Sequence, residues 1–144
     1  MKKLMFLLFL FSSSVFAADA IYTPWHNNLA IRGYDTVAYF TENAPVKGKK
    51  AHSMEWQGAT WRFSSNENLA LFKANPEKYA PQYGGYCAYA VANGSLASIE
   101  PEQFTILNDK LYLNYNADVQ QQWLEKRDAY IELADKKWPS ILND

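Results

Sequence analysis

The stretch EWQGATWRFSSNENLALFKANPEKYAP, residues Glu55–Pro81, decides the fold of this chain. Two runs rich in strand-forming residues, Ser53–Trp56 and Ala59–Phe63, flank a Gln-Gly pair that favours a tight turn. The spacing therefore predicts an antiparallel hairpin whose second strand carries large aromatic side chains on one face.

A short helix is expected directly after this hairpin. Ser64 lies three residues before Glu67, which is the spacing of a capping box, so the helix is predicted to begin near Ser64. Leu69 and Phe72 supply its apolar stripe. The Asn-Pro pair at 75–76 ends it, because proline disfavours a helical residue before it and cannot continue the hydrogen-bond ladder.

Further elements follow on both sides of this stretch. Thr36–Phe40 reads as a short buried strand, and Thr41–Lys50 as a solvated loop. Phe104–Leu107 and Lys110–Tyr115 flank an Asn-Asp turn and predict a second hairpin. Ala117–Trp138 is predicted to be one long helix with an apolar stripe. The stripe consists of Val119, Trp123, Tyr130 and Leu133. The predicted fold class is a small single-domain α+β protein of short antiparallel β-hairpins, a short central helix and a long C-terminal helix.

The N-terminus has the pattern of a secretory signal peptide over residues 1–17. Lys2 and Lys3 precede the apolar run Leu4–Phe11, which is shorter than the about 20 residues that a membrane span needs. Small residues before the predicted cleavage point fit cleavage after Ala17. We therefore expect export to the periplasm and no membrane association after cleavage.

Composition limits the class of partner. Removal of residues 1–17 from the 144-residue chain takes away two lysines and leaves 127 residues with 12 basic and 15 acidic side chains, a net charge of −3. That length suits one domain, here an N-terminal arm over 18–33 and a domain over 34–139. Because no basic cluster remains to follow a phosphate backbone, we expect no nucleic-acid partner.

Several motifs, in the same order, resemble those of the YHS domain. The opening stretch has its strand, glycine turn, aromatic strand and short helix ending in a P-E-K-Y-like tail. GYDTVAYF (33–40), YGGYCA (83–88) and KLYLNY (110–115) resemble the exported proteins called YHS domain-containing (seleno)proteins. The resemblance runs from about Ala30 to Trp138 and implies the fold. It also implies a binding or accessory role, with zinc or copper as candidate ligands.

The ligands that this resemblance implies are cysteines in an F-C-S-x-x-C-like run. Here that run is Phe63–Asn68, FSSNEN, which has no cysteine, and hydroxyl and amide groups are poor ligands for soft cations. A copper or zinc site would have to draw on His26, His52, Met54 and Cys87. In a strand, His52 and Met54 share a face, and Cys87 would be a third ligand. Alternatively, Met54 fills the core and His52 ends a loop.

Cys87 is the only cysteine, so no internal disulfide can form. One hypothesis is a redox-active thiol, which would make Cys87 the only catalytic candidate. Such a thiol needs a nearby cation, helix N-terminus or base, and His26 or His52 could serve as the base. The "(seleno)protein" label of the family hints at redox chemistry. The alternative is a buried, inert cysteine.

A third possibility is a pocket for a small ligand. Tyr34, Asp35, Tyr83 and Tyr86 are its candidate lining residues, although Asp35 could instead cap a turn and the tyrosines could simply pack. Motifs of hydrolases, nucleotide-binding proteins and haem attachment are missing from the sequence. We therefore expect a soluble periplasmic binding or accessory protein that handles a metal such as copper. A thiol redox protein and a module that binds a small ligand or protein partner are the alternatives.

Overall fold

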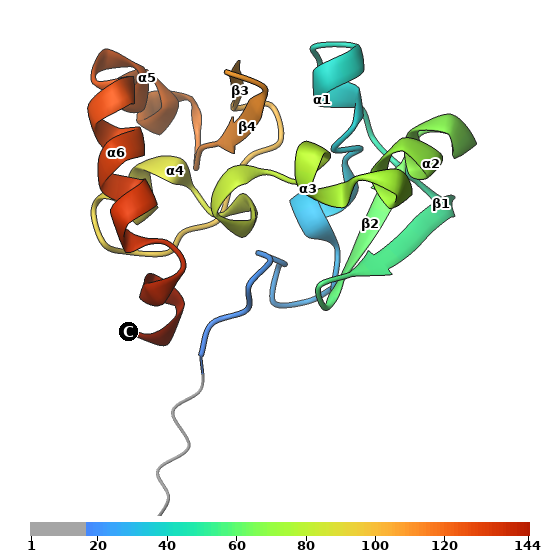
Figure 1. The fold of residues 1–144 in the computed structure, drawn as a ribbon, viewed down its shortest axis with the longest axis horizontal. Helices are drawn as coiled ribbons and strands as arrows, with labels where there is room; N and C mark the ends of the chain where they lie inside the picture. Colours follow the sequence, from blue (N-terminus) through green and yellow to red (C-terminus); the bar gives the residue numbers. More distant parts are fainter. Residues whose placement is uncertain (1–16) are drawn as a thin grey trace, which may run out of the picture.

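The computed structural model describes residues 17–144 (Figure 1). The predicted signal peptide lies outside this range except for Ala17. Within the described residues, every helix is too short or too polar to cross a membrane.

The first predicted hairpin is confirmed. β1 (Lys49–Trp56) pairs antiparallel with β2 (Ala59–Phe63). Gln57 and Gly58 form the turn, with φ of 48° and 79°, so both central residues adopt the left-handed conformation that suits a two-residue hairpin. Alternation along β2 buries its aromatic face, in agreement with the prediction.

Two helices follow, α2 (Asn66–Ala74) and α3 (Pro76–Tyr79). The predicted end of the first helix at residues 75–76 is confirmed. The helix begins near Ser64 as predicted, but the predicted cap is wrong by one residue, because the side chain of Ser65, and not that of Ser64, accepts the backbone N–H of Asn68 at 3.2 Å. Ser64 therefore keeps its side chain and its N–H for a different partner.

The strand predicted over Thr36–Phe40 is wrong. The segment instead forms a one-turn helix, α1 (Ala38–Thr41), after the 3-10 turn η1 (Ala30–Gly33). The Asp35 carboxylate accepts the N–H groups of the two residues that precede and open α1, and so stabilises a helix start. A short apolar run is compatible with either a buried strand or a buried helix, so its pattern could not decide between them.

The remaining elements form the C-terminal half of the molecule. They are η2 (Gln82–Gly85), α4 (Ala88–Ala92), β3 (Phe104–Leu107), β4 (Lys110–Leu113), α5 (Ala117–Glu125), α6 (Arg127–Lys137) and η3 (Ser140–Asn143). The hairpin β3–β4 is confirmed, with its turn residues at φ of 51° and 60°. We refer to β1, β2, α1, α2 and α3 as the N-terminal half. Figure 1 shows the two halves side by side.

The long C-terminal helix predicted over Ala117–Trp138 is wrong. The chain breaks at Lys126, whose φ of −135° and ψ of 40° are not helical, so α5 and α6 are separate helices. The break shifts the buried face: Trp123 and Ala134 are buried, whereas Leu133 is 43% exposed. The predicted stripe therefore fails at Leu133, whereas Tyr130 packs on the core as predicted. The α+β fold class itself is confirmed.

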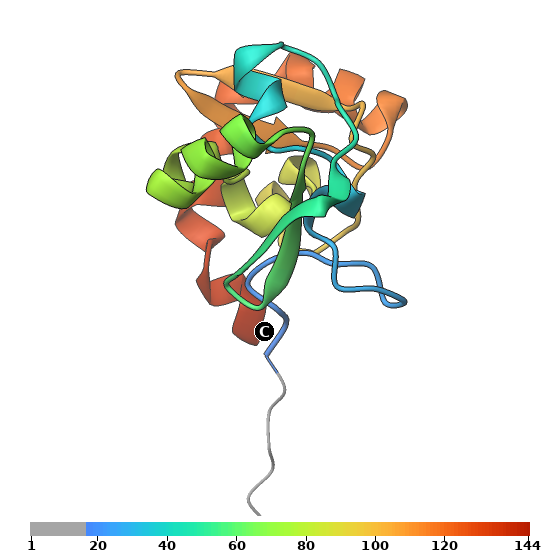
Figure 2. The same ribbon diagram turned by 90° about the vertical axis from the view of Figure 1, so that its right-hand side faces the viewer.

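β4 lies between the two clusters of the core. Its alternating side chains point to opposite sides, so Leu111 and Leu113 belong to the cluster that contains Trp61 and Phe72, while Tyr112 packs with Trp123 in the other cluster. Figure 2 looks onto the N-terminal half, with the C-terminal helices behind it. The second hairpin thus contributes buried side chains to both clusters and in this way connects the two halves.

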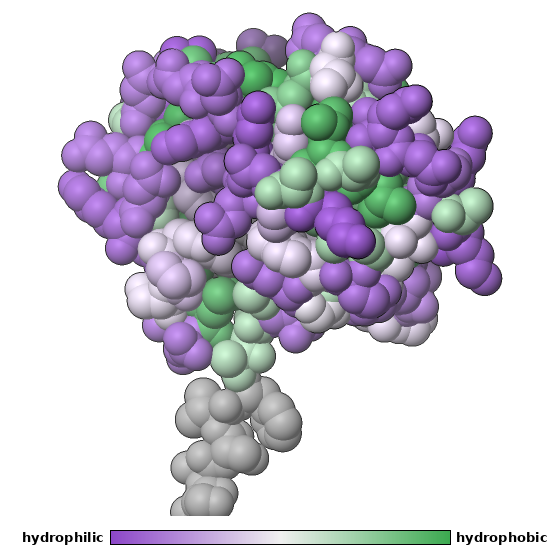
Figure 3. Space-filling model, turned by 45° about the vertical axis from the view of Figure 1, so that its right-hand side comes forward, coloured by the Kyte–Doolittle hydropathy of each residue, from purple (hydrophilic) through white to green (hydrophobic). Residues whose placement is uncertain are grey.

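The surface is mainly hydrophilic in the view of Figure 3, with apolar side chains in small separate groups. Large apolar residues that are exposed lie on several different elements: Trp25, Leu71, Tyr115, Leu124 and Leu133. Trp25, in the N-terminal arm, is the most exposed of them at 96%. Concavities between elements are therefore better candidates for a site than any broad apolar face.

Candidate functional site

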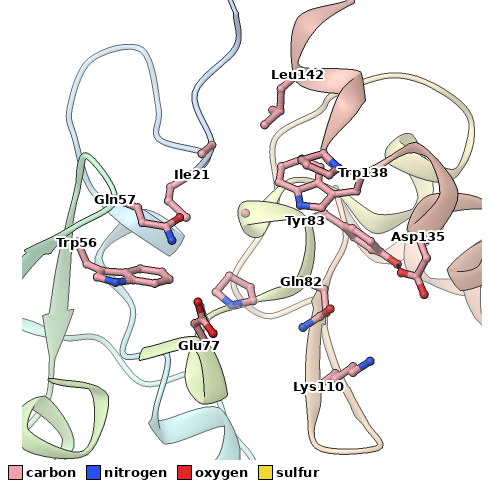
Figure 4. A pocket seen from close by; sticks show the side chains of 15 residues that line it. Ile21, Trp56, Gln57, Glu77, Gln82, Tyr83, Lys110, Asp135, Trp138 and Leu142 are labelled. Carbon is pink, nitrogen blue, oxygen red and sulfur yellow. Dashed lines mark hydrogen bonds between the residues drawn. The ribbon is translucent and has the colours of Figure 1, made fainter. Parts of the chain in front are cut away.

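A groove of about 500 Å³ lies between the two halves (Figure 4). The N-terminal half contributes Trp56, Gln57 and Glu77. The C-terminal half contributes Tyr83, Lys110, Asp135 and Trp138. Figure 4 shows Trp56 and Trp138 on opposite sides, with charged and amide side chains between and below them. The groove combines aromatic surface with a few convergent polar and charged groups, a combination that can bind a small molecule.

Tyr83 fixes one carboxylate of this groove. Its hydroxyl donates a hydrogen bond to Oδ1 of Asp135 at 2.9 Å. Burial first, and then the hydrogen bond to Asp135, raise the pKa of Tyr83 far above its usual range. Tyr83 therefore remains a neutral donor at physiological pH and holds the Asp135 side chain at the wall of the groove.

The N-terminal arm closes the upper end of the groove with Ala20 and Ile21. The backbone N–H of Tyr22 donates to the carbonyl of Gly84 at 2.8 Å, and the hydroxyl of Tyr86 donates to the carbonyl of Asp19 at 2.8 Å. Of the predicted ligand-binding tyrosines, Tyr83 thus lines the groove, and Tyr86 binds the arm.

Tyr34 and Asp35 lie away from this groove. The Tyr34 hydroxyl donates to Glu102 at 3.2 Å. Asp35 is fully buried, and its two oxygens accept five hydrogen bonds. The donors to Oδ1 are the N–H groups of Val37 and Ala38 at 2.9 and 3.1 Å. The donors to Oδ2 are the N–H and hydroxyl of Ser64 and the side-chain amide of Asn68, each at 2.8 Å. We call these residues, Asp35, Val37, Ala38, Ser64 and Asn68, the Asp35 network.

The Asp35 network does not fit the metal that the family resemblance implies. Ser64 and Asn68 occupy the two positions where that resemblance expects cysteines. Both direct hydrogen atoms, not lone pairs, toward the centre of the network. A soft cation would find neither thiolate nor imidazole among these residues.

His52 and Met54 share one face of β1, as predicted from their spacing. Nδ1 of His52 lies 2.8 Å from Oδ1 of Asn66, which accepts, so Nδ1 is the donor in this contact, and in the neutral imidazole Nε2 then has the lone pair. Met54 packs on the core. Cys87, the third predicted ligand, directly precedes α4 in the other half, and α4 and β1 lie on opposite sides of the molecule in Figure 1, so the fold does not bring the three residues to one face. Among the described residues, no group of three or more His, Cys, Asp or Glu side chains could hold a metal.

Cys87 is 1% exposed, and its Sγ lies 3.5 Å from Oδ1 of Asn114. Burial raises the pKa of the thiol, and nearby backbone N–H groups of Ala90, Tyr115 and Tyr89 oppose this rise only in part. A cavity of about 250 Å³ beside it is lined mainly by apolar and aromatic side chains and includes no histidine. This environment favours the neutral thiol and not the reactive thiolate.

We therefore expect the Cys87 thiol of the native protein to react with a disulfide reagent about 100-fold more slowly than in the unfolded chain. The rate of thiolate release from 5,5′-dithiobis(2-nitrobenzoate), with and without denaturant, measures this difference. Cys87→Ser is the control that identifies the signal. Equal rates in the native and unfolded protein would restore Cys87 as a redox candidate.

Sequence reasoning missed most of the groove. Trp56, Glu77, Lys110, Asp135 and Trp138 come from β1, α3, β4, α6 and the residue after α6. They form no local motif, and only their convergence in space makes a site. The abundance of tryptophan, five residues in the chain, was an available signal, although composition alone could not tell core from groove residues.

The fold and the groove together define a small α+β protein with a ligand-sized site between its two halves. The family model of the YHS domain matches residues 37–83. No curated protein and no solved structure matches the chain. The chain therefore carries a YHS domain over this segment, and the YHS family is associated with metal binding. The matched segment supplies Trp56 and Glu77, whereas Asp135 and Trp138 come from the chain beyond it.

Proposed function

We propose that this protein is exported to the periplasm and acts there as a YHS-type binding protein that holds a small organic molecule in the groove. One observation carries the proposal: aromatic rings and carboxylates from both halves converge on a single concavity of about 500 Å³. Export is supported by the basic, apolar and small-residue pattern of residues 1–17.

The lining of the groove favours a ligand with an apolar part and a positive charge. Trp56 and Trp138 offer ring faces, which attract both apolar groups and cations. The carboxylates of Glu77 and Asp135 outnumber the single ammonium of Lys110. Asp135 is already oriented by Tyr83, so a ligand ammonium would meet a carboxylate that needs little reordering.

Benzylamine, an aromatic ammonium ion, is the probe that tests this proposal, and benzoate is its matched anion. In ¹H–¹⁵N spectra we expect benzylamine to shift the indole N–H signals of Trp56 and Trp138. Trp25 serves as the internal reference, because it is 96% exposed and lies outside the groove. Trp56→Ala and Trp138→Ala should each weaken binding about tenfold, which corresponds to about 1.4 kcal/mol.

Two results would contradict the groove as a binding site for cations. One is an equal response to benzylamine and benzoate. The other is a shift of Trp25 as large as those of Trp56 and Trp138, which would indicate unspecific contact with the surface.

Copper handling is the second candidate function, and the side chain of His52 favours it. The hydrogen bond from Nδ1 to Asn66 fixes the ring and leaves Nε2 as a possible ligand, which is the arrangement common around metal-bound histidines. Met54 on the same face would supply a soft thioether for Cu(I). This copper-binding hypothesis needs only His52 and Met54 as ligands, and Cys87 is not one of them.

A competition titration with the Cu(I) chelator bicinchoninate tests this candidate. We expect His52→Ala and Met54→Leu each to weaken Cu(I) uptake about tenfold. Cys87→Ser is the matched control and should leave uptake unchanged. Absence of uptake by the wild-type protein, or its loss in Cys87→Ser, would eliminate the His52–Met54 site.

A further inference from the structure

The Asp35 network contains a buried carboxylate whose hydrogen-bond donors are all uncharged groups. Asp35 takes part in neither of the two ion pairs found in the described residues, which are Arg127–Asp128 and Lys136–Glu132. Its oxygens instead accept three backbone N–H groups, one hydroxyl and one side-chain amide. Because burying a carboxylate is costly without such partners, this number of donors indicates a structural role for its charge.

The donors to Asp35 come from three separate elements. Val37 and Ala38 belong to the start of α1, Ser64 directly follows β2, and Asn68 lies in the first turn of α2. The carboxylate therefore joins the one-turn helix, the aromatic hairpin and the central helix at a single point. A metal ion bound at positions 64 and 68 would join the end of the same strand to the same helix.

We propose that Asp35 takes the place of a metal ion at the centre of this YHS domain, so that the domain folds and keeps its stability without metal. With Ser64 and Asn68 in place, the backbone favours the carboxylate over a cation at this centre. The N–H groups of Val37, Ala38 and Ser64 point at the carboxylate whatever the side chains do. A cation placed there would face the positive ends of these three dipoles.

The side chains of Ser64 and Asn68 complete the argument. To offer lone pairs to a cation, both would have to stop donating to Oδ2 of Asp35. That rotation would leave a fully buried carboxylate with fewer partners, at a cost comparable to losing charge-assisted hydrogen bonds. The inference concerns the Asp35 network only, so its test is independent of ligand binding in the groove and of copper binding by His52 and Met54.

The test uses the full mature chain with Zn²⁺ and Co²⁺ as probes. For the wild type we expect the same thermal midpoint in EDTA and in excess Zn²⁺, and no visible Co²⁺ absorption of the tetrahedral type. The double variant Ser64→Cys/Asn68→Cys restores thiolates at the two positions. Its midpoint should rise by about 8 °C at a hundredfold excess of Zn²⁺ over the dissociation constant, and Co²⁺ should give thiolate charge-transfer bands.

Two outcomes would overturn the proposal. The first is a wild-type midpoint that falls in EDTA and recovers with Zn²⁺, together with loss of that response in Asp35→Asn. The second is a folded double variant that shows neither a Zn²⁺ response nor Co²⁺ bands, because then positions 64 and 68 would not be a potential metal centre at all. If the double variant does not fold, the chelator measurement on the wild type still decides the first point.

Discussion

We expect Asp35→Ala to lower the free energy of unfolding by about 4 kcal/mol, because the substitution leaves several buried donors without an acceptor. The donors that lose their partner include the backbone N–H groups of Val37 and Ala38, which open α1, and the N–H of Ser64. The side chains of Ser64 and Asn68 lose the same acceptor. Urea unfolding followed by tryptophan fluorescence measures the change.

Ser64→Ala and Asn68→Ala are the matched comparisons for this prediction. Each removes one side-chain donor and leaves Asp35 four other hydrogen bonds, so each should cost about 1–2 kcal/mol. A loss for Asp35→Ala no larger than that of either neighbour would show that the carboxylate is not the centre of the network.

The second large effect is expected at Gly84, where the N-terminal arm crosses η2. A Cβ at this position would lie 1.9 Å from the carbonyl oxygen of Ala20, and the φ of Gly84 is +62°. Gly84→Ala must therefore displace the arm as well as strain the backbone, and we expect a loss of about 3 kcal/mol. The displaced arm should also become more sensitive to limited proteolysis near Tyr22, whose N–H bonds to the Gly84 carbonyl.

Gly94→Ala separates the two causes. Gly94 has a similar backbone conformation, with φ of +83°, but a Cβ there would meet nothing within 4 Å. The control should cost only about 1 kcal/mol, the strain of a left-handed residue. If both variants show the same loss of unfolding free energy and the same rate of proteolysis in the N-terminal arm, the close approach of Gly84 to Ala20 does not contribute to the effect of Gly84→Ala.

Local chemistry predicted the parts of this fold that short motifs determine. Gln57-Gly58 and Asn108-Asp109 set the two hairpin turns through residues that tolerate positive φ. The predictions of secondary structure were wrong where a contact between residues distant in the sequence determines the local conformation. Asp35 stabilises the start of a helix in a segment of strand-like composition. It also accepts a hydrogen bond from the Ser64 side chain, so Ser65 and not Ser64 caps α2. The break at Lys126 has no proline or glycine to announce it.

The candidate site was less predictable than the fold. The sequence singled out Tyr83 as a candidate lining residue and the structure places it in the groove, but its partner Asp135 is 52 positions away. His52 and Met54 share a face because strand alternation is local, whereas the position of Cys87 relative to them depends on how the two halves pack. Residues that only tertiary packing brings together have no characteristic spacing in the sequence, so the sequence does not reveal that they form a site.

The most direct test of the proposed binding function is a crystal structure of the mature protein with benzylamine. We predict ligand density in the groove between Trp56 and Trp138, with the ammonium group within hydrogen-bond distance of Glu77 or Asp135. An empty groove at saturating benzylamine, or density only at a site that shares none of these residues, would contradict the proposal.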